Sequence, residues 1–284
     1  MRRVLTMVGL AIAAALACVA LITIWLWRNQ ERVVFQPPRL AVDAPLPARR
    51  VAFTAEDGHA LFGYVLSPAL ADPSGTVVIA FHGNADMAAW TVPWARELME
   101  FAGVTVFVPE YRGYAGIPGT PTYRTAASDA RGALAFARAE LHPQRLVLFG
   151  HSLGSAIASE LALAMRPSAP DALILQSPFT SAREMAARMF VPPLPWLWRQ
   201  ISRVHYDTRA AVAVIEAPVS VAHGTRDLNI PARMGRQVFH GARRPGTLLL
   251  VEGAGHNDVA DAGGDRYWKW LRDAVTATAS DGRR

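Results

Sequence analysis

The sequence predicts an α/β domain built on a mostly parallel, doubly wound sheet, with an antiparallel hairpin at its N-terminal edge and one transmembrane helix before it. Three observations carry this prediction. Short apolar runs alternate with helical stretches over most of the 284 residues. Two strands of alternating polarity come before the first buried run, and a long uncharged stretch opens the chain. We therefore divide the chain into an N-terminal anchor (1–32), a linker (33–48) and one domain (49–284).

The composition excludes several classes of protein. Hydrophobic residues make up 51% of the chain and charged residues 18%, which excludes a disordered or fibrous protein. The single cysteine, Cys18, excludes an internal disulfide and a cysteine-based zinc site. The net charge is +6 and nearly all of the positive charge is arginine, but the arginines are scattered and no nucleic-acid-binding signature occurs. We expect no nucleic-acid partner, and the sequence indicates no oligomeric state.

The first element is an uncharged run from Val4 to Trp27. A spanning helix needs about 20 apolar residues, so this run is long enough to cross a bilayer. Trp25 and Trp27 at its end, followed by Arg28, are typical of a membrane interface. We expect a retained single-pass anchor, whose short basic N-terminus stays in the cytoplasm and leaves the domain on the extracytoplasmic side.

Two other interpretations of this run remain open. Arg2 and Arg3 with the small residues Ala15 and Ala17 resemble a cleaved signal peptide. A lipoprotein signal ending at Cys18 is the other possibility, although the usual leucine three residues earlier is absent. Apolar sequence continues past Cys18 to Trp27, which fits neither form of cleavage and favours the anchor.

The elements of the domain follow a proline-rich linker. A hairpin is predicted for Val51–Phe53 and Leu61–Leu66, with a turn at Glu56-Asp57-Gly58. Buried parallel strands are predicted for six apolar runs: Thr76–Phe81, Val104–Val108, Leu146–Phe149, Ala172–Leu175, Val219–Ala222 and Thr247–Val251. Helices are predicted between them at Ala88–Phe101, Thr125–Leu141, Ser155–Met165, Pro231–Phe239 and Arg266–Thr278. Because ligands of such sheets bind at the carboxyl ends of the strands, the residues after each strand are the candidates for chemistry.

Ser152 is the candidate nucleophile. Gly150-His151-Ser152-Leu153-Gly154 follows a predicted strand and precedes an alanine-rich helix, which is the strand–turn–helix context of the G-x-S-x-G motif. Small residues are needed there because a strained turn brings the adjacent strand and helix very close. The alternative is an ordinary helix start in which Ser152 serves as the N-cap.

Two backbone regions are candidates for an oxyanion hole. The N–H of Leu153 lies at the predicted start of a helix, where the helix dipole adds to its effect. The turn His82-Gly83-Asn84-Ala85 follows the third predicted strand and can supply a second donor from Asn84 or Ala85. The sequence does not choose between these two residues, and a tight turn without function is the alternative.

Asp227 and His256 complete a candidate triad. Asp227 follows the strand Val219–Ala222 and can orient an imidazole, while His256 lies in a glycine-rich loop after the last strand and can act as general base. The order serine, aspartate, histidine along the chain agrees with that of the strand–turn–helix serine hydrolases. The alternatives are a helix N-cap for Asp227 and a surface position for His256.

We expect neither a metal nor a cofactor. The sequence lacks the H-E-x-x-H spacing and other metal-ligand spacings, so no catalytic metal is predicted. It also lacks the G-x-x-x-x-G-K phosphate loop and the G-x-G-x-x-G fingerprint after the first strand, so no nucleotide is expected.

At these motifs the sequence resembles the α/β-hydrolase superfamily, and it is most similar to a branch of membrane-anchored, lysophospholipase- or esterase-like proteins. The resemblance covers the chain from about Val51 to its end. The matching stretches are Phe81–Ala85, Tyr111–Tyr114, Gly150–Gly154, Ser177–Ser181, His223–Asp227 and Gly255–Asp258. It implies the α/β-hydrolase fold, with Ser152 as nucleophile, Asp227 as orienting carboxylate and His256 as base. Ser155 and Glu110 depart from the usual glycine and aspartate, which leaves the shape of the pocket open.

The segment Met185–Val204 is the candidate substrate-binding region. It is rich in Met, Phe, Trp and Pro and follows the sixth predicted strand. We expect Met185, Met189, Phe190 and Trp196 to form an apolar wall for an acyl chain close to the membrane. The alternative is a helix and loop that only pack on the core.

The function expected from these residues is hydrolysis of carboxylic esters with aliphatic or lipid-like acyl groups through an acyl-enzyme on Ser152. An amidase or peptidase with the same triad is one alternative, because the residues alone do not separate ester from amide cleavage. A non-catalytic, membrane-bound binding protein that retains the fold is the other. The expected partners are a small ester or lipid substrate and the membrane that holds the N-terminal helix.

Overall fold

The computed structural model describes residues 2–45, 47–69, 74–190 and 194–277. Its centre is an eight-stranded sheet in the order β1-β2-β4-β3-β5-β6-β7-β8. β2 is antiparallel to both β1 and β4, and the remaining neighbours are parallel. The strands are β1 Arg49–Thr54, β2 Ala60–Leu66, β3 Thr76–Phe81, β4 Thr105–Pro109, β5 Arg145–His151, β6 Ala172–Gln176, β7 Val219–Gly224 and β8 Pro245–Val251. The predicted α/β fold, with its N-terminal hairpin and mostly parallel sheet, is confirmed.

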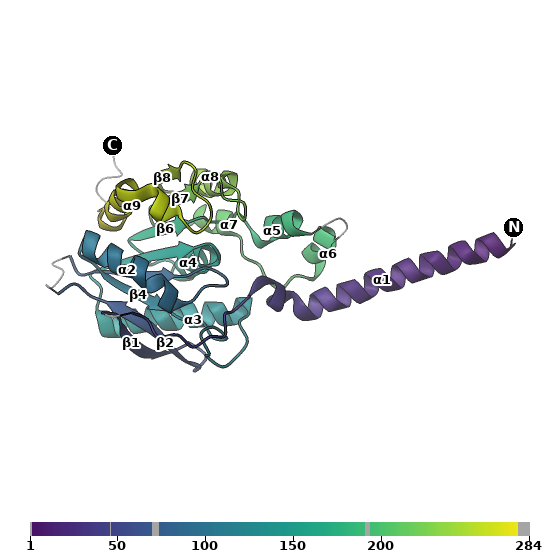
Figure 1. Cartoon of the computed structure of the whole chain (residues 1–284), viewed down its shortest axis with the longest axis horizontal. Helices are drawn as coiled ribbons and strands as arrows, with labels where there is room; N and C mark the ends of the chain where they lie inside the picture. Colours follow the sequence, from purple (N-terminus) through teal and green to yellow (C-terminus); the bar gives the residue numbers. More distant parts are fainter. Residues whose placement is uncertain (1, 46, 70–73, 191–193, 278–284) are drawn as a thin grey trace.

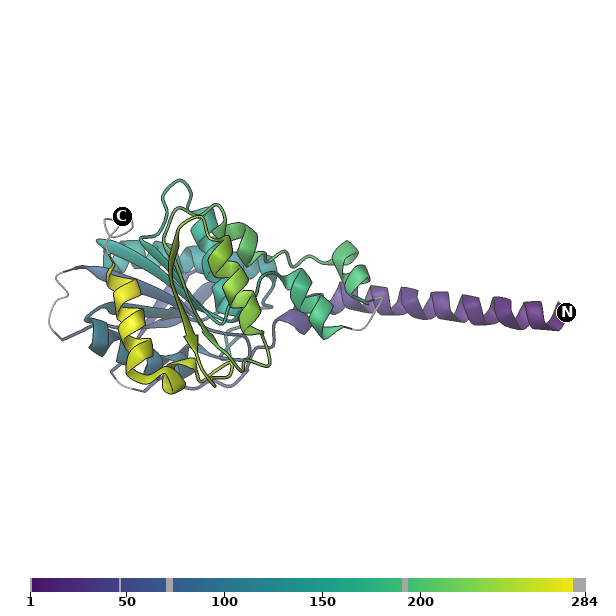
Figure 2. The same ribbon diagram turned by 90° about the horizontal axis from the view of Figure 1, so that it is seen from above.

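Helices cover both faces of the sheet (Figures 1 and 2). The helices of the domain are α2 Ala88–Ala102, α3 Tyr123–Phe136 continued by a π-helical turn at Ala137–Leu141, α4 Leu153–Ala164, α5 Ala182–Met189, α6 Leu194–Ile201, α7 Thr208–Val212, α8 Ala232–Gly241 and α9 Val259–Thr276. α2 and α9 pack in one cluster of buried side chains, and α3, α4, α7 and α8 pack in the other.

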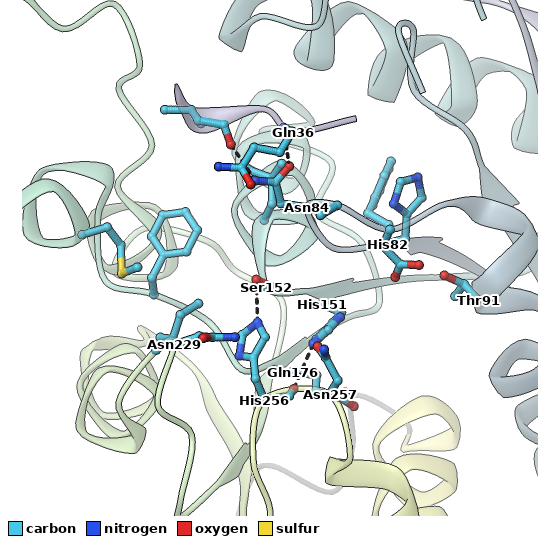
Figure 3. A pocket seen from close by; sticks show the side chains of 18 of the residues that line it. Gln36, His82, Asn84, Thr91, His151, Ser152, Gln176, Asn229, His256 and Asn257 are labelled. Atoms are coloured by element: carbon cyan, nitrogen blue, oxygen red, sulfur yellow. Dashed lines mark hydrogen bonds between the residues drawn. The ribbon is translucent and has the colours of Figure 1, made fainter. Parts of the chain in front are cut away.

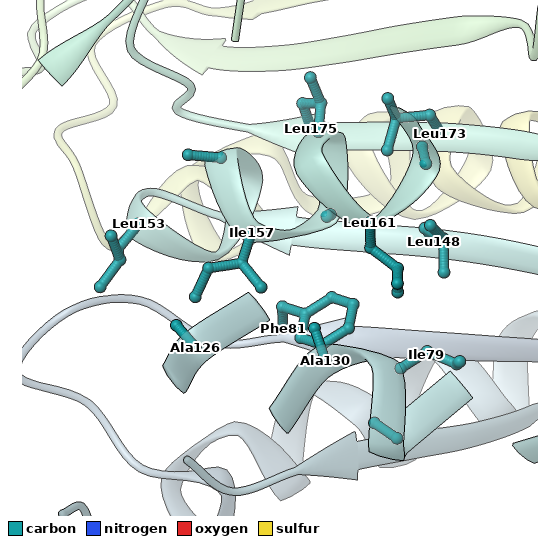
Figure 4. Close-up of a cluster of buried hydrophobic side chains, with 14 of the residues drawn as sticks. Ile79, Phe81, Ala126, Ala130, Leu148, Leu153, Ile157, Leu161, Leu173 and Leu175 are labelled. Atoms are coloured by element: carbon teal, nitrogen blue, oxygen red, sulfur yellow. The ribbon is translucent and has the colours of Figure 1, made fainter. Parts of the chain in front are cut away.

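Successive side chains of each buried strand supply these two clusters alternately. In β3, Ile79 and Phe81 belong to the cluster under α3 and α4, whereas Val78 and Ala80 belong to the cluster under α2 and α9. This period of two is what a strand covered on both faces requires, and it explains the uninterrupted apolar runs in the sequence. Figure 4 shows Leu153, Ile157 and Leu161 of α4 lying over the strands and against α3.

The strand order reverses direction between β3 and β5. The chain proceeds from β3 to β4 on one side and from β4 across to β5 on the other. A crevice forms at the carboxyl ends of the strands where such a reversal occurs. The loops after β3 and β5 carry the two motifs centred on Asn84 and Ser152, so the topology places both at this crevice.

The N-terminal run forms one helix, α1, over Arg2–Val34, which is long and apolar enough to cross a membrane. It extends away from the domain on the side where α5 and α6 lie (Figures 1 and 2). The helix continues past Arg32, where the sequence-based division places the end of the anchor, and ends at Val34.

Two helices, α7 and α9, differ from the sequence-based prediction. α7 has no counterpart among the predicted helices; it is a short helix, and the side chain of Asp207 caps it by accepting a hydrogen bond from the Ala210 amide. α9 starts at Val259 rather than Arg266 and contains a non-helical residue, Gly264. Two adjacent glycines lower the helix propensity there and hide the first turns. The predicted helix end at Thr278 lies outside the described residues.

Candidate active site

Ser152 lies on a strained turn between β5 and α4. Its backbone has φ 53° and ψ −116°, a conformation that costs a side-chain-bearing residue about 1–3 kcal/mol. The flanking glycines make the turn possible, because a Cβ on Gly154 would collide with the Phe81 carbonyl oxygen and one on Gly150 would collide with Gly154 itself. The Ser152 hydroxyl makes no capping hydrogen bond to α4, which argues against a simple N-cap role.

The structure brings Ser152, His256 and Asp227 together, although they lie in three separate loops (Figure 3 shows the first two). His256 Nδ1 lies 2.7 Å from Asp227 Oδ2, and His256 Nε2 lies 3.0 Å from Ser152 Oγ. A carboxylate only accepts hydrogen bonds, so Nδ1 carries the proton and Nε2 presents a lone pair to the serine hydroxyl. This arrangement allows His256 to take the Ser152 proton.

The Asp227 carboxylate is held in its ionised form. Its Oδ1 accepts hydrogen bonds from the amides of Asn229 and Ile230, at 2.9 and 2.8 Å. Its Oδ2 also faces His223 Nε2 at 3.2 Å. Burial works to raise the pKa of Asp227, but the hydrogen bonds from His223, His256 and the Ile230 amide outweigh it and hold the pKa well below its usual range.

His223 is a second imidazole on the triad carboxylate. Its side chain is fully buried, and its Nε2 also lies 2.7 Å from the Ile230 carbonyl oxygen. Both neighbours of Nε2 are acceptors, so Nε2 carries a proton and His223 donates to Asp227. In the sequence, His223 is only the first residue of the matching stretch His223–Asp227; the structure makes it a positioning residue for the carboxylate.

The loop that carries His256 is fixed through its main chain. His151 Nε2 and the Ser177 hydroxyl both donate to the His256 carbonyl oxygen, at 3.2 and 3.5 Å. Desolvation, and then the proximity of His256, lower the pKa of His151 to about 4. His151 is therefore neutral near pH 7 and adds no positive charge beside His256.

The turn after β3 is held by a buried ion pair. His82 Nδ1 lies 2.9 Å from the Gly83 carbonyl oxygen, and His82 Nε2 lies 2.8 Å from Glu110 Oε1. Burial works to lower the pKa of His82, but Glu110 outweighs it and the pKa is raised. With acceptors at both nitrogens, the ring is an imidazolium. Glu110, one of the two departures from the family pattern, thus reaches across to hold the turn.

Asn84, Ala85 and Leu153 border the cavity that contains Ser152. Leu153 is the first residue of α4, so its N–H is one of the unpaired donors at a helix start. Ala85 has a positive φ of 52°, which marks the turn as tightly constrained. The predicted oxyanion residues therefore lie around one space beside the serine.

The cavity has a volume of about 1290 Å³, which is more than a small-molecule site usually needs. Met185, Met189 and Phe190, predicted from the sequence, line it. Trp196 does not: it lies outside the lining and is 61% exposed, whereas Trp198 lines the cavity and is 3% exposed. Two residues turn a helix by about 200°, so only one of the two indoles can face inward. This corrects the prediction for Trp196.

Sequence reasoning missed one part of the lining. Val33, Val34 and Gln36, at the end of α1 and just after it, border the same cavity as Ser152. The sequence does carry a signal, because apolar residues return at positions 33–35 after the polar stretch 28–32. The linker assignment overlooked it.

Within the described residues, no group of three or more His, Cys, Asp or Glu side chains is placed to hold a metal ion.

Comparisons with known proteins agree with this architecture. The family model "Serine aminopeptidase, S33" matches residues 72–210. The chain is 34% identical over 279 residues to the uncharacterized protein Rv2307c of Mycobacterium tuberculosis, covering 95% of this chain and 96% of that protein. It is 28% identical over 179 residues to the lysophosphatidylserine lipase ABHD12 of Danio rerio, covering 58% of this chain and 47% of that one.

A solved structure shows the same fold. The esterase Pf2001 of Pyrococcus furiosus superposes with a TM-score of 0.66 and 18% identity, covering 85% of this chain and 97% of the esterase. Together with the parallel sheet, the strained serine turn and the full-length similarity to the mycobacterial protein, this establishes the family. The chain belongs to the α/β-hydrolase superfamily.

Proposed function

We propose that this protein is a serine hydrolase that cleaves carboxylic esters carrying aliphatic or lipid-like acyl groups. The observation that carries the proposal is the unbroken series of hydrogen bonds from Asp227 through His256 to Ser152. A hydroxyl, an imidazole and a carboxylate in this order convert a weak alcohol into a nucleophile.

In the first half-reaction, Ser152 Oγ attacks the ester carbonyl carbon and His256 Nε2 takes the hydroxyl proton. The carbonyl oxygen becomes an oxyanion, which accepts hydrogen bonds from the Leu153 N–H and from an N–H of the Asn84–Ala85 turn. Asp227 stabilises the imidazolium that forms. The tetrahedral intermediate collapses, the alcohol leaves with the proton from His256, and the acyl group remains on Ser152.

In the second half-reaction, water takes the place of the alcohol. His256 removes a proton from the water as its oxygen attacks the acyl carbonyl carbon, and the same two backbone regions hold the oxyanion. The bond between Ser152 Oγ and the acyl carbon breaks, and His256 returns its proton to the serine. A carboxylic acid leaves and the free enzyme is restored.

The lining of the cavity supports the proposal of an acyl substrate. The lining near α5 and α6 is largely apolar, with Met185, Met189, Phe190 and Trp198 among its side chains. Burying each methylene of an acyl chain there contributes about 0.8 kcal/mol. Two similar proteins bear the names esterase and lysophosphatidylserine lipase, which also favours an ester.

The proposal includes a membrane location. α1 serves as a single-pass anchor, and its short basic N-terminus stays in the cytoplasm, leaving the hydrolase domain extracytoplasmic. Fractionation with and without an alkaline carbonate wash tests the anchor, and protease digestion of intact cells tests the side. A soluble protein shortened at its N-terminus would overturn the anchor in favour of a signal peptide.

Ser152→Ala tests the nucleophile. We expect the variant to lose hydrolysis of p-nitrophenyl esters and covalent labelling by a fluorophosphonate, because no oxygen remains for attack or phosphonylation. Ser155→Ala is the matched control, since the Ser155 hydroxyl donates to the Ser152 carbonyl oxygen rather than to the triad. Activity retained in Ser152→Ala would disprove the assignment. Failure of the wild-type protein to label would support the non-catalytic alternative.

Cleavage of amides is the second candidate reaction, because the matching family model is named for serine aminopeptidases. Parallel assays with p-nitrophenyl esters and aminoacyl p-nitroanilides distinguish the two. We expect turnover of the esters; faster turnover of the anilides at equal concentration would replace the esterase proposal with a peptidase.

A further inference from the structure

The C-terminal part of α1 is packed on the hydrolase domain. Most of the helix is exposed, but Leu26 is 3% exposed, Gln30 is fully buried and Phe35 is 3% exposed. Leu26 and Gln30 are four residues apart and lie on one face of the helix, and Phe35 follows directly after the helix ends. The domain therefore begins inside α1, before the point at which the helix ends.

Polar contacts fix this face to the segment after α6. The Gln30 side-chain amide donates to the Ile201 carbonyl oxygen at 3.3 Å, and its oxygen accepts a hydrogen bond from the Arg203 amide. The Arg203 guanidinium lies over the Trp27 ring, 5.2 Å from its centroid, and donates to the Trp27 carbonyl oxygen at 3.0 Å. These contacts thus hold the end of α1 in a fixed position against the α6 region.

The residues that follow are hydrogen-bonded to the turn after β3. The Asn84 side-chain nitrogen donates to the Val34 carbonyl oxygen at 2.7 Å, and its oxygen accepts from the Gln36 amide at 2.9 Å. The Tyr114 hydroxyl donates to the same oxygen at 2.9 Å. Figure 3 shows Gln36 and Asn84 side by side above Ser152. One asparagine therefore joins the end of the anchor to the turn expected to hold the oxyanion.

This docking makes the end of α1 part of the cavity. Val33 and Val34 line the same space as Ser152, together with Met185 and Phe190. We propose that Val33 and Val34 form one wall of the acyl-binding site, so that the membrane anchor itself sets the acyl length that the enzyme accepts. This inference rests on the proposed esterase function and extends it to residues in the membrane-proximal helix.

The position of Val33 and Val34 explains why they would affect acyl length and not the chemical step. A chain bound between Val33, Val34 and the α5–α6 side chains leaves the cavity beside the helix that enters the bilayer. A bulkier wall shortens the space for the chain but does not alter Ser152 or His256. Acyl selectivity and the chemical step should therefore separate in variants of these two valines.

The experiment uses the full-length protein in detergent micelles. Val33→Trp and Val34→Trp are made separately, and Val19→Trp is the matched control because Val19 lies on an exposed part of the same helix. For each protein, kcat/KM is measured with p-nitrophenyl butyrate and p-nitrophenyl palmitate. Labelling of Ser152 by a short-chain fluorophosphonate reports the integrity of the site in each variant.

We expect the palmitate-to-butyrate ratio to fall about tenfold in at least one of the two wall variants, while labelling persists and Val19→Trp keeps the wild-type ratio. Wild-type ratios in both Val33→Trp and Val34→Trp, with the wild-type enzyme active, would overturn the proposal and leave the esterase function standing. A wild-type protein that hydrolyses neither ester would overturn the proposed function and this inference with it.

Discussion

The rim of the sheet and the wall formed by α1, α5 and α6 contribute to one cavity in different ways. At the rim, Ser152, Asp227 and His256 each lie a few residues after a parallel strand, so the sheet fixes their positions. At the wall, Val33 and Trp198 come from helices that protrude from the sheet and are held by contacts with each other. The rim is set by strand order and the wall by packing between distant segments.

Substitutions at the rim and at the wall should affect the kinetic constants in different ways. Changing a rim residue should alter the chemical step for every substrate, because the hydrogen bonds there act on the reacting atoms. Changing a wall residue should alter which substrate is accepted, because in the proposed complex the wall contacts only the acyl chain. Kinetic constants measured with short and long esters therefore distinguish the two regions.

The largest effect is expected at Asp227, the proposed orienting carboxylate. Asp227→Asn should lower kcat by roughly 10²–10⁴ for short and long esters alike, because the neutral amide no longer stabilises the His256 imidazolium. The side chain keeps its volume, and its oxygen can still accept from the Ile230 amide, so the fold should persist. Steady-state kinetics with two chain lengths, together with circular dichroism, check both expectations.

Asp258→Asn is the matched control for this prediction. Asp258 is the carboxylate nearest to His256 along the chain, and its Oδ1 accepts a hydrogen bond from the Gly255 amide at 2.7 Å. An asparagine oxygen can accept the same bond, so kcat should stay within severalfold of the wild-type value. Normal turnover in Asp227→Asn combined with a collapse in Asp258→Asn would reassign the orienting role.

The next effect concerns the ion pair behind the turn after β3. Glu110→Gln removes the charge that raises the pKa of His82, and both side chains are fully buried. We expect a loss of about 1–3 kcal/mol in the free energy of unfolding and a drop in kcat of about tenfold, because the Gly83 carbonyl loses an imidazolium donor. The drop should be the same for short and long esters.

The pH dependence of that stability loss follows from the direction of the pKa shift. The folded state holds the His82 proton more tightly than the unfolded chain, in which the pKa is near 6.5. The pair's contribution is complete below that pH and is lost as the pH rises through the folded-state pKa. Unfolding midpoints of wild type and Glu110→Gln should therefore differ most at mildly acid pH, where carboxyl groups are still ionised, and converge at alkaline pH. A constant difference would show that the pair is not ionic.

The sequence could predict the rim because each of its residues carries a local signal. A strand is an apolar run, and each candidate loop is a glycine-rich motif within a few residues of its end, so Ser152 and His256 could be placed without the structure. Once the strands are parallel, their carboxyl ends must meet at one edge. The fold prediction succeeded for the same reason. The glycines on either side of Ser152 leave room for the tight turn in which its φ is positive.

The wall could be predicted only in part: Met185, Met189 and Phe190 line the cavity as expected, but the contacts that hold the wall together could not be foreseen. Contacts such as that between Gln30 and Arg203 join residues far apart in the sequence, and no local sequence pattern predicts them. The choice between Trp196 and Trp198 depends on how α6 is rotated against the domain, which a short helix in an apolar segment does not reveal. The His82–Glu110 pair is hidden for a related reason, because it links the turn after β3 with the end of β4.

The smallest effect is expected for the two indoles of α6, which test the wall directly. Trp198→Ala should change the palmitate-to-butyrate ratio of kcat/KM by about three- to tenfold, because it removes apolar surface that lines the cavity. Trp196→Ala removes the same side chain from an exposed position and should leave the ratio unchanged in micelles. If instead Trp196→Ala shifts the ratio and Trp198→Ala does not, the acyl chain runs along the outer face of α6, and the wall would have to be moved there.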